Sequence, residues 1–261
     1  MLRTVLAGLS VCLVTVEAQA GAWTQPEGDG LFIMTTARRA APASALFSDV
    51  ADQDSNSTRI FVEYGVFDDL TLGLTAFTDF SNTDQDLEAA IGGHVRYRVL
   101  ADDNWVLSVQ GGASFPIERW FGSRFGDDRP DSVPEYDIRM LYGRGWQLDW
   151  GNGFISTEFG LRLRGEGQSE ELRFDATLGH EPLKGVLGLM SVFASAEMGD
   201  GQESSFKLSP SIAYTQFPWL GSNDKKPAGF AVPDTVQIGV TWDVMNPEDG
   251  LEIGVSIWRR F

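Results

Sequence analysis

The sequence contains a single cysteine in 261 residues, Cys12, and that cysteine lies within the first twenty residues. If those residues are removed, the remaining chain has no disulfide, no thiolate metal ligand and no cysteine nucleophile. Positive charge is also scarce, because 20 Lys and Arg stand against 37 Asp and Glu and give a net charge of −17. Nucleic acid is therefore excluded as a partner, since its phosphates require basic patches.

Long apolar runs and catalytic motifs are missing as well. After residue 20 no apolar stretch approaches the ~20 residues that a membrane-spanning helix needs. The two histidines, His94 and His180, lack the spacing to a serine that lipid hydrolases use, and neither a phosphate-binding glycine loop nor a zinc spacing is present. We therefore expect no catalytic residue, no metal and no cofactor.

The first twenty residues have the features of a secretory signal. Arg3 supplies a positive start, residues 5–16 are apolar, and Ala18 and Ala20 flank Gln19 just before Gly21. Small residues at those two positions are typical of a cleavage site, so residues 1–20 are predicted to be a signal peptide removed after Ala20.

The rest of the chain alternates apolar and polar residues. In residues 87–99, Ile91, Val95 and Tyr97 fall on one face, whereas His94 and Arg96 fall on the other. A period of two is the period of a β-strand. The pattern predicts about twelve strands, near residues 30–38, 57–67, 70–79, 87–99, 105–115, 135–146, 153–164, 170–180, 186–198, 206–217, 235–243 and 251–261.

The lengths of the links between these strands favour a transmembrane barrel. Links after even-numbered strands, such as Asp68-Asp69, are mostly short, whereas residues 39–56 and 116–134 form long ones. Short periplasmic turns and longer external loops are typical of antiparallel up-and-down barrels in outer membranes. We expect residues 21–29 to be a short periplasmic segment, residues 30–261 to form the barrel, and residues 116–134 to fold in and constrict it. A soluble lipocalin, with eight strands, or a β-sandwich is the rival fold.

Two segments carry a resemblance to a known group of proteins. The last strand alternates apolar residues and stops on a phenylalanine, with Val255, Ile257 and Phe261 in the alternating positions. It resembles the C-terminal signal of bacterial outer-membrane β-barrels, from which Arg259 departs. Residues 63–73 resemble a strand–turn–strand unit of uncharacterised proteobacterial barrels, including those grouped with aromatic-degradation transporters. The resemblance implies location in the outer membrane, contact with its lipid and lipopolysaccharide, and recognition by the barrel-assembly machinery.

In a membrane barrel the polar rows face the lumen. The lumenal row then contains a ladder of arginines, with acidic residues and one histidine among them: Arg96, Arg98, Arg139, Arg162, Arg164, Arg173, Glu88, Glu158, Asp175 and His94. This ladder makes part of the lumen basic, and it can be interpreted in two ways. It could select anions in a pore, or its arginines could pair with the carboxylates in a network that fills and stiffens the barrel.

Passive passage of small solutes, with anions favoured if the first interpretation holds, is the leading functional hypothesis. A non-conducting structural or adhesion barrel acting through its external loops is the second. A lipid-modifying outer-membrane enzyme is the third, and no nucleophile beside His94 supports it.

Overall fold

The computed structural model describes residues 21–41, 53–81, 86–117, 134–165, 169–199, 204–215, 234–247 and 250–261. These residues form twelve strands and confirm the expected all-β class. The strands are β1 Gly30–Ala41, β2 Gln53–Phe67, β3 Leu70–Ser81, β4 Asp86–Asp102, β5 Trp105–Pro116, β6 Glu135–Leu148, β7 Gly151–Arg164, β8 Glu170–Leu183, β9 Val186–Met198, β10 Ser204–Tyr214, β11 Thr235–Asp243 and β12 Leu251–Arg260.

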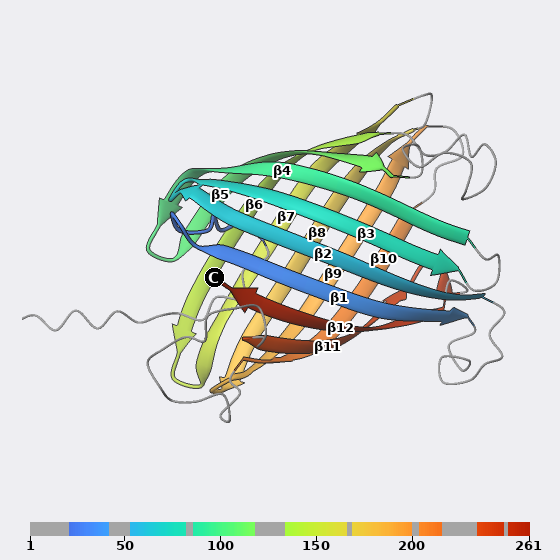
Figure 1. Ribbon diagram of the computed structural model, residues 1–261. Helices are drawn as coiled ribbons and strands as arrows, with labels where there is room; N and C mark the ends of the chain where they lie inside the picture. Colours follow the sequence, from blue (N-terminus) through green and yellow to red (C-terminus); the bar gives the residue numbers. More distant parts are fainter. Residues whose placement is uncertain are drawn as a thin grey trace, which may run out of the picture.

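Each strand pairs antiparallel with its neighbours in the chain, and the sheet closes where β1 pairs with β12 (Figure 1). The closing seam runs from Leu31 opposite Arg260 to Ala40 opposite Leu251. Beyond it, the backbones of Gly30 and Phe261 exchange two hydrogen bonds of 2.8 and 3.0 Å. The result is an up-and-down barrel without a free sheet edge, which is the arrangement that satisfies every strand inside a membrane.

One end of the barrel is made of tight turns. Two-residue turns at residues 68–69, 103–104, 149–150 and 184–185 join the strand pairs there, and we call it the turn end. The opposite end, where the longer links leave the strands, is the loop end. The links expected to be long at residues 39–56 and 116–134 leave the strands at this end, and their central parts, residues 42–52 and 118–133, lie outside the described residues, as does the constriction expected from residues 116–134. The link between β10 and β11 leaves from the turn end instead, where Thr215 donates to the carbonyl oxygen of Gly185, and its residues 216–233 also lie outside the described residues.

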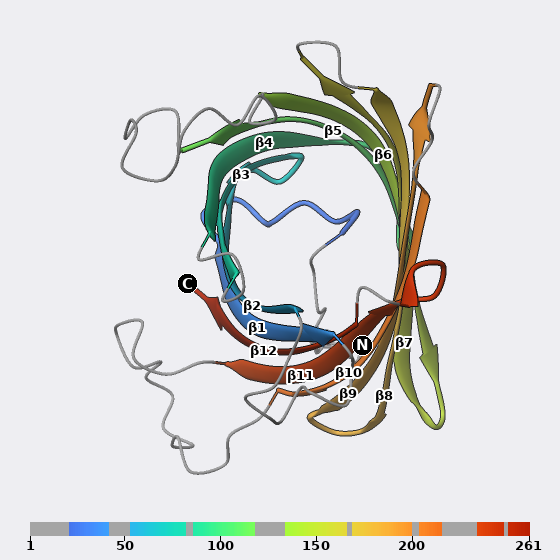
Figure 2. The same ribbon diagram turned by 90° about the vertical axis from the view of Figure 1, so that its right-hand side faces the viewer.

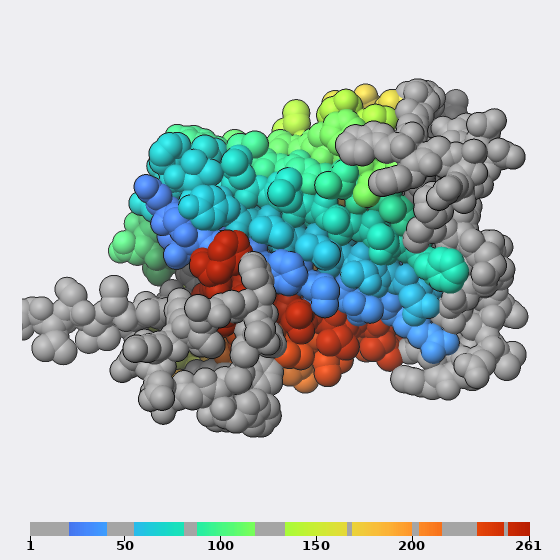
Figure 3. Space-filling model, in the orientation of Figure 1, coloured from blue at the N-terminus to red at the C-terminus, as the bar shows by residue number. Residues whose placement is uncertain are grey.

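The outer face of the barrel is apolar. Leu74, Ile138 and Ile212 each expose more than 60% of their surface there, although they lie in the middle of strands. Aromatic pairs mark both ends of this face, with Trp105 stacked on Tyr142 near the turns and Phe115 against Tyr136 near the loops. Figure 3 shows this face as a continuous wall of side chains from β1 to β3 and β12. An apolar band between two aromatic rims is the surface of a transmembrane barrel.

Helices play no part in this architecture. Among the residues that the structure describes, none of the helical segments is long and apolar enough to cross a membrane. The barrel wall therefore positions the side chains of the strands discussed below, and the register between neighbouring strands decides which of them meet.

Candidate pore and its closing segment

Residues 21–29 lie inside the ring of strands at the turn end. Figure 2, which looks along the barrel, shows this dark-blue start of the described chain crossing the interior. The segment is anchored where Gly28 donates to the carbonyl oxygen of Gly65 at 2.9 Å and Gly65 donates back to Asp29 at 2.9 Å. A Cβ atom at Gly65 would overlap the carbonyl oxygen of Pro26, so only glycine allows this approach. We call residues 21–29 the closing segment.

Hydrogen bonds hold the middle of the closing segment to the wall next to its anchor. The Thr24 hydroxyl donates to the carbonyl oxygen of Asp68 at 2.7 Å, and the Gln25 backbone N–H donates to the Thr71 hydroxyl at 2.8 Å. Both contacts join the segment to the turn between β2 and β3 or to the first residues of β3. They fix the direction in which the chain enters the lumen.

The far end of the closing segment reaches β5 and β7. The Ser108 hydroxyl donates to the carbonyl oxygen of Ala22 at 2.6 Å, and the Ala22 N–H donates to the Ser156 hydroxyl at 3.3 Å. The buried side chains of Ala22, Val106 and Leu141 form one apolar cluster, and Trp23 packs against it. The segment therefore spans the lumen from β2 to β7.

A second apolar cluster fills the rest of this cross-section. Leu187, Leu189 and Ala213 point inward from β9 and β10, and Phe154 and Trp258 pack against them. The Trp23 ring meets the Phe154 ring edge-on at 6.1 Å, which connects the two clusters. Together the clusters and the closing segment form a layer across the turn half of the lumen.

A buried ion cluster completes the layer. Glu63 is fully buried, and its carboxylate accepts from Arg96 at 2.7 Å, from Gln25 at 2.9 Å and contacts His94 at 3.2 Å. Arg96 also donates to the carbonyl oxygen of Trp23 at 2.9 Å. A buried carboxylate and guanidinium are stable only as a hydrogen-bonded pair, and two of the bonds that complete this pair come from the closing segment.

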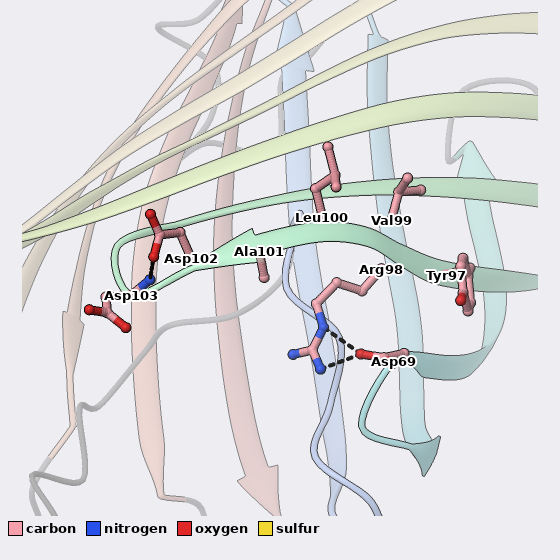
Figure 4. A pocket seen from close by; sticks show the side chains of 8 residues that line it. All are labelled: Asp69, Tyr97, Arg98, Val99, Leu100, Ala101, Asp102 and Asp103. Carbon is pink, nitrogen blue, oxygen red and sulfur yellow. Dashed lines mark hydrogen bonds and ion pairs between the residues drawn. The ribbon is translucent and has the colours of Figure 1, made fainter.

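Arg98 lies apart from this cluster, at the rim of the turn end. Its Nε donates to the Asp69 carboxylate at 2.7 Å, which ties β4 to the turn between β2 and β3 (Figure 4). The same shallow pocket contains Asp102 and Asp103, where the Asp103 N–H donates to the Asp102 carboxylate at 2.8 Å. Arg98 therefore stiffens the turn end.

The other arginines of the ladder lie in the loop half of the lumen and are paired. Arg139 lies within 3.5 Å of the carboxylates of Asp137, Glu158 and Asp175, which come from β6, β7 and β8. Nearer the loops, Arg162 and Arg164 share Glu135 and Glu171, and Arg164 also binds Glu197 at 2.8 Å. Arg173 has looser contacts with Glu171 and Asp175, at 3.6 and 3.8 Å.

These side chains form one carboxylate–arginine network on the wall from β6 to β9. Its members are Arg139, Arg162, Arg164, Arg173, Glu135, Asp137, Glu158, Glu171, Asp175 and Glu197. Six carboxylates thus accompany four arginines, so this wall is not basic in total. Glu88, also on the lumenal row of the ladder, is exposed on β4 near the loop end.

Exposure divides the lumen into two halves. The side chains of Glu63, Arg96 and His94 keep at most 8% of their surface exposed. In the carboxylate–arginine network, nine of the ten side chains keep between 16% and 32%. The charged side chains of the ion cluster in the turn half are therefore buried, while those in the loop half remain in contact with solvent.

The wall opposite the network carries hydroxyl groups. Thr35 bonds Ser256 at 2.8 Å, and Ser209 bonds Thr241 at 2.8 Å, so hydroxyl pairs cross the β1–β12 and β10–β11 seams. Such pairs stabilise the wall without adding charge. The network is thus confined to the wall from β6 to β9, while hydroxyl pairs cross seams of the remaining wall.

The two histidines have different surroundings. His94 contacts Glu63 and stacks on Phe61 inside the lumen, whereas His180 lies at the turn end with its ring 4.3 Å from Trp150. Within the described part of the chain, neither ring hydrogen-bonds a serine hydroxyl. No group of three or more metal-ligating side chains occurs there that could hold an ion.

Comparisons with known proteins agree with this fold. No protein-family model and no curated protein matches the chain. The structure is similar to an outer-membrane channel from Pseudomonas putida F1, with a TM-score of 0.54 and 12% identity over 94% of this chain and 100% of that one. It is also similar to the NanC porin, with a TM-score of 0.53 and 11% identity over 87% of this chain and 97% of the porin. At these identities the likeness shows the fold.

Proposed function

We propose that the protein is an outer-membrane channel for passive passage of small solutes, and that its closing segment gates the lumen. The observation that carries the proposal is the contrast between a solvent-contacting, charged loop half and a turn half whose ion cluster is buried. A channel needs a polar lumen, and among the described residues that lumen is interrupted by a nine-residue segment and the side chains around it. Two structures with this fold are themselves described as an outer-membrane channel and a porin.

The proposed orientation places the turn end in the periplasm and the loop end outside the cell. Short periplasmic turns and long external loops are the rule in bacterial outer-membrane barrels. The closing segment then lies on the periplasmic side. The strand that carries Val255, Ile257 and Phe261, the proposed assembly signal, ends on the same side and closes the barrel against Gly30. Outer-membrane lipid, lipopolysaccharide and the barrel-assembly machinery are the corresponding partners.

Anion preference is the finer part of this proposal. The network contains more carboxylates than arginines, so its guanidinium groups are neutralised locally and act first as wall structure. A preference for anions must therefore come from cations that carboxylates do not hold.

A second function has its own support. The layer made by the closing segment and the two apolar clusters favours a barrel that does not conduct and acts through its external surface. The two functions differ in whether the segment leaves the lumen.

The test is single-channel recording of the refolded mature chain in planar bilayers, beside the same chain lacking residues 21–29. We expect brief openings in the complete chain and long openings in the shortened one. In both samples boiling must change the electrophoretic mobility of the protein, which marks a folded barrel before boiling. A shortened chain that is folded and silent would reject the channel and leave the non-conducting function.

A further inference from the structure

Two arginines face each other from opposite walls in the loop half of the lumen. Arg59 lies on β2 and Arg173 on β8, and these strands stand six places apart in either direction round the ring. Arg59 lies four residues before the lumenal Glu63 and so shares its face, while Arg173 belongs to the network. A solute moving along the barrel must pass between them.

These two cations are less neutralised than the other lumenal arginines. Among the described residues no carboxylate lies within 4.0 Å of Arg59, and Glu252, on the neighbouring part of the lumenal face, is held at 3.2 Å by Arg39. The nearest carboxylates to Arg173 lie at 3.6 and 3.8 Å, too far for a good hydrogen bond. Both side chains therefore keep N–H donors that no carboxylate holds at hydrogen-bonding distance, and both remain in contact with solvent.

An aromatic ring contacts Arg59, and another lies on the wall that carries Arg173. The Arg59 guanidinium lies over the Phe77 ring, 5.4 Å from its centre. On the other wall, Phe193 pairs with Asp175 across the β8–β9 seam and so faces the lumen beside the row of Arg173. Phe193 is 37% exposed, which is unusual for a phenylalanine on the polar face of a barrel. Apolar surface is thus offered next to both charges.

We infer that Arg59 and Arg173 form a binding site for an organic anion, namely a small carboxylate with an apolar body. A carboxylate matches the planar donors of a guanidinium, and two guanidinium groups of like charge are stabilised by an anion between them. The rings of Phe77 and Phe193 would contact the apolar part of the same molecule. This inference deepens the proposed channel function and rests on it only for the direction of transport, because binding itself requires no opening.

The test uses sodium benzoate as the probe and isothermal titration of the refolded mature chain in detergent. We expect benzoate to bind the unchanged chain, and Arg59→Gln and Arg173→Gln each to weaken binding about tenfold, since each removes a charge-assisted contact. Arg98→Gln is the control, because Arg98 is an arginine of the same ladder that pairs with Asp69 at the turn end, away from both walls of the site, and we expect it to leave the affinity unchanged. Phe193→Leu should weaken benzoate binding while leaving inorganic phosphate unaffected.

Several results would overturn the site. Absence of benzoate binding to the folded chain, an affinity in both glutamine variants equal to that of the unchanged chain, or equally tight binding of neutral benzyl alcohol would each reject it. Folding of every variant is checked by the gel shift on boiling, and Arg59→Gln removes no ion pair, so its barrel should form. Conductance separates the two proposals: a conducting chain that ignores benzoate rejects the site alone, and a silent chain that binds benzoate rejects the channel alone.

Discussion

The Glu63 carboxylate is the point at which the closing segment is most sensitive to a single change. In the closed arrangement it is fully buried and bonds Arg96 and Gln25. Glu63→Gln keeps the shape of the side chain and some hydrogen bonding but leaves the Arg96 guanidinium without its counter-charge. Once the segment leaves, water reaches Arg96, so the penalty acts almost entirely on the closed state. The substitution should therefore shift the equilibrium towards the open state.

The magnitude follows from the contacts. Residues 22–25 make six hydrogen bonds to the wall, worth roughly 1 kcal/mol each. Ordering these four residues costs about 1–2 kcal/mol per residue, so the two contributions nearly cancel. Burial of Trp23 and Ala22 then leaves a closed state favoured by a few kcal/mol. Removing one partner of a buried ion pair costs about 3–5 kcal/mol. Because the glutamine still accepts a hydrogen bond, we expect the closed state to be destabilised by about 2 kcal/mol. This raises the ratio of open to closed channels by a factor of about thirty.

The assay is the open fraction in single-channel records of the unchanged chain and of Glu63→Gln. Glu197→Gln is the control, because it removes a lumenal carboxylate from an arginine in the solvent-contacting half. We expect the open fraction to rise about thirtyfold in the first variant and to stay constant in the second. An open fraction in Glu63→Gln within about threefold of the unchanged chain, or an equal rise in Glu197→Gln, would refute the role of the buried cluster.

Three further changes test other parts of the structure. A Cβ atom at Gly143 would lie 2.7 Å from the Trp23 ring, so Gly143→Ala should raise the open fraction about tenfold through overpacking of ~1–3 kcal/mol, measured by the same recordings. Ile138→Lys places a charge on the lipid face and should lower the free energy of unfolding from vesicles by about 2–4 kcal/mol in urea titrations, whereas Ile138→Leu should match the unchanged chain. Arg139→Gln leaves three carboxylates without their shared cation, so the reversal potential should move towards cation preference, and Glu158→Gln should move it the opposite way.

The barrel could be predicted from the sequence because the alternation of apolar and polar residues within each strand separates its lipid-facing side from its lumenal side. In residues 87–99 the alternation alone assigns His94 and Arg96 to the lumen and Val95 to lipid, and the structure confirms the strand there. Strand number and most boundaries follow from the same local signal and from tight turns such as Asp68-Asp69. The boundaries differ by a few residues where a strand continues past its hydrophobic pattern, as β4 does to Asp102.

The closing segment could not be predicted in this way. From the sequence we expect residues 21–29 to be a short periplasmic segment; in the structure they lie within the ring of strands at the turn end, the end that the proposed orientation places in the periplasm. The segment has no period, and its partners, such as Thr71, Ser108 and Ser156, are 46 to 134 residues away in the chain. Polar residues on the lumenal face of a strand are ordinary in a barrel, so the sequence around Thr71, Ser108 and Ser156 does not indicate that these side chains bond the backbone of the closing segment.

Charge balance in the lumen also depends on register. The sequence shows arginines on four strands, but it does not show that Glu158 lies opposite Asp175 or that Arg162 lies opposite Glu171. The register joins most arginines to carboxylates and favours the network over a free ladder. Arg59 differs because its strand neighbours on the lumenal face, Thr35 and Phe77, carry no charge. Its lack of a carboxylate partner is therefore a property of the assembled wall.

The order of the two halves has a consequence for how solute and seal interact. In the proposed orientation a solute arriving from outside meets the Arg59–Arg173 pair before it reaches the buried cluster around Glu63. Binding between the arginines neutralises charge in the loop half, while the seal is held by contacts around Glu63 that the solute does not touch. If the two halves are independent, benzoate should bind with the same affinity to Glu63→Gln as to the unchanged chain. A changed affinity in that variant would mean that the two halves are coupled, since a coupling between two sites must appear in the affinity of each.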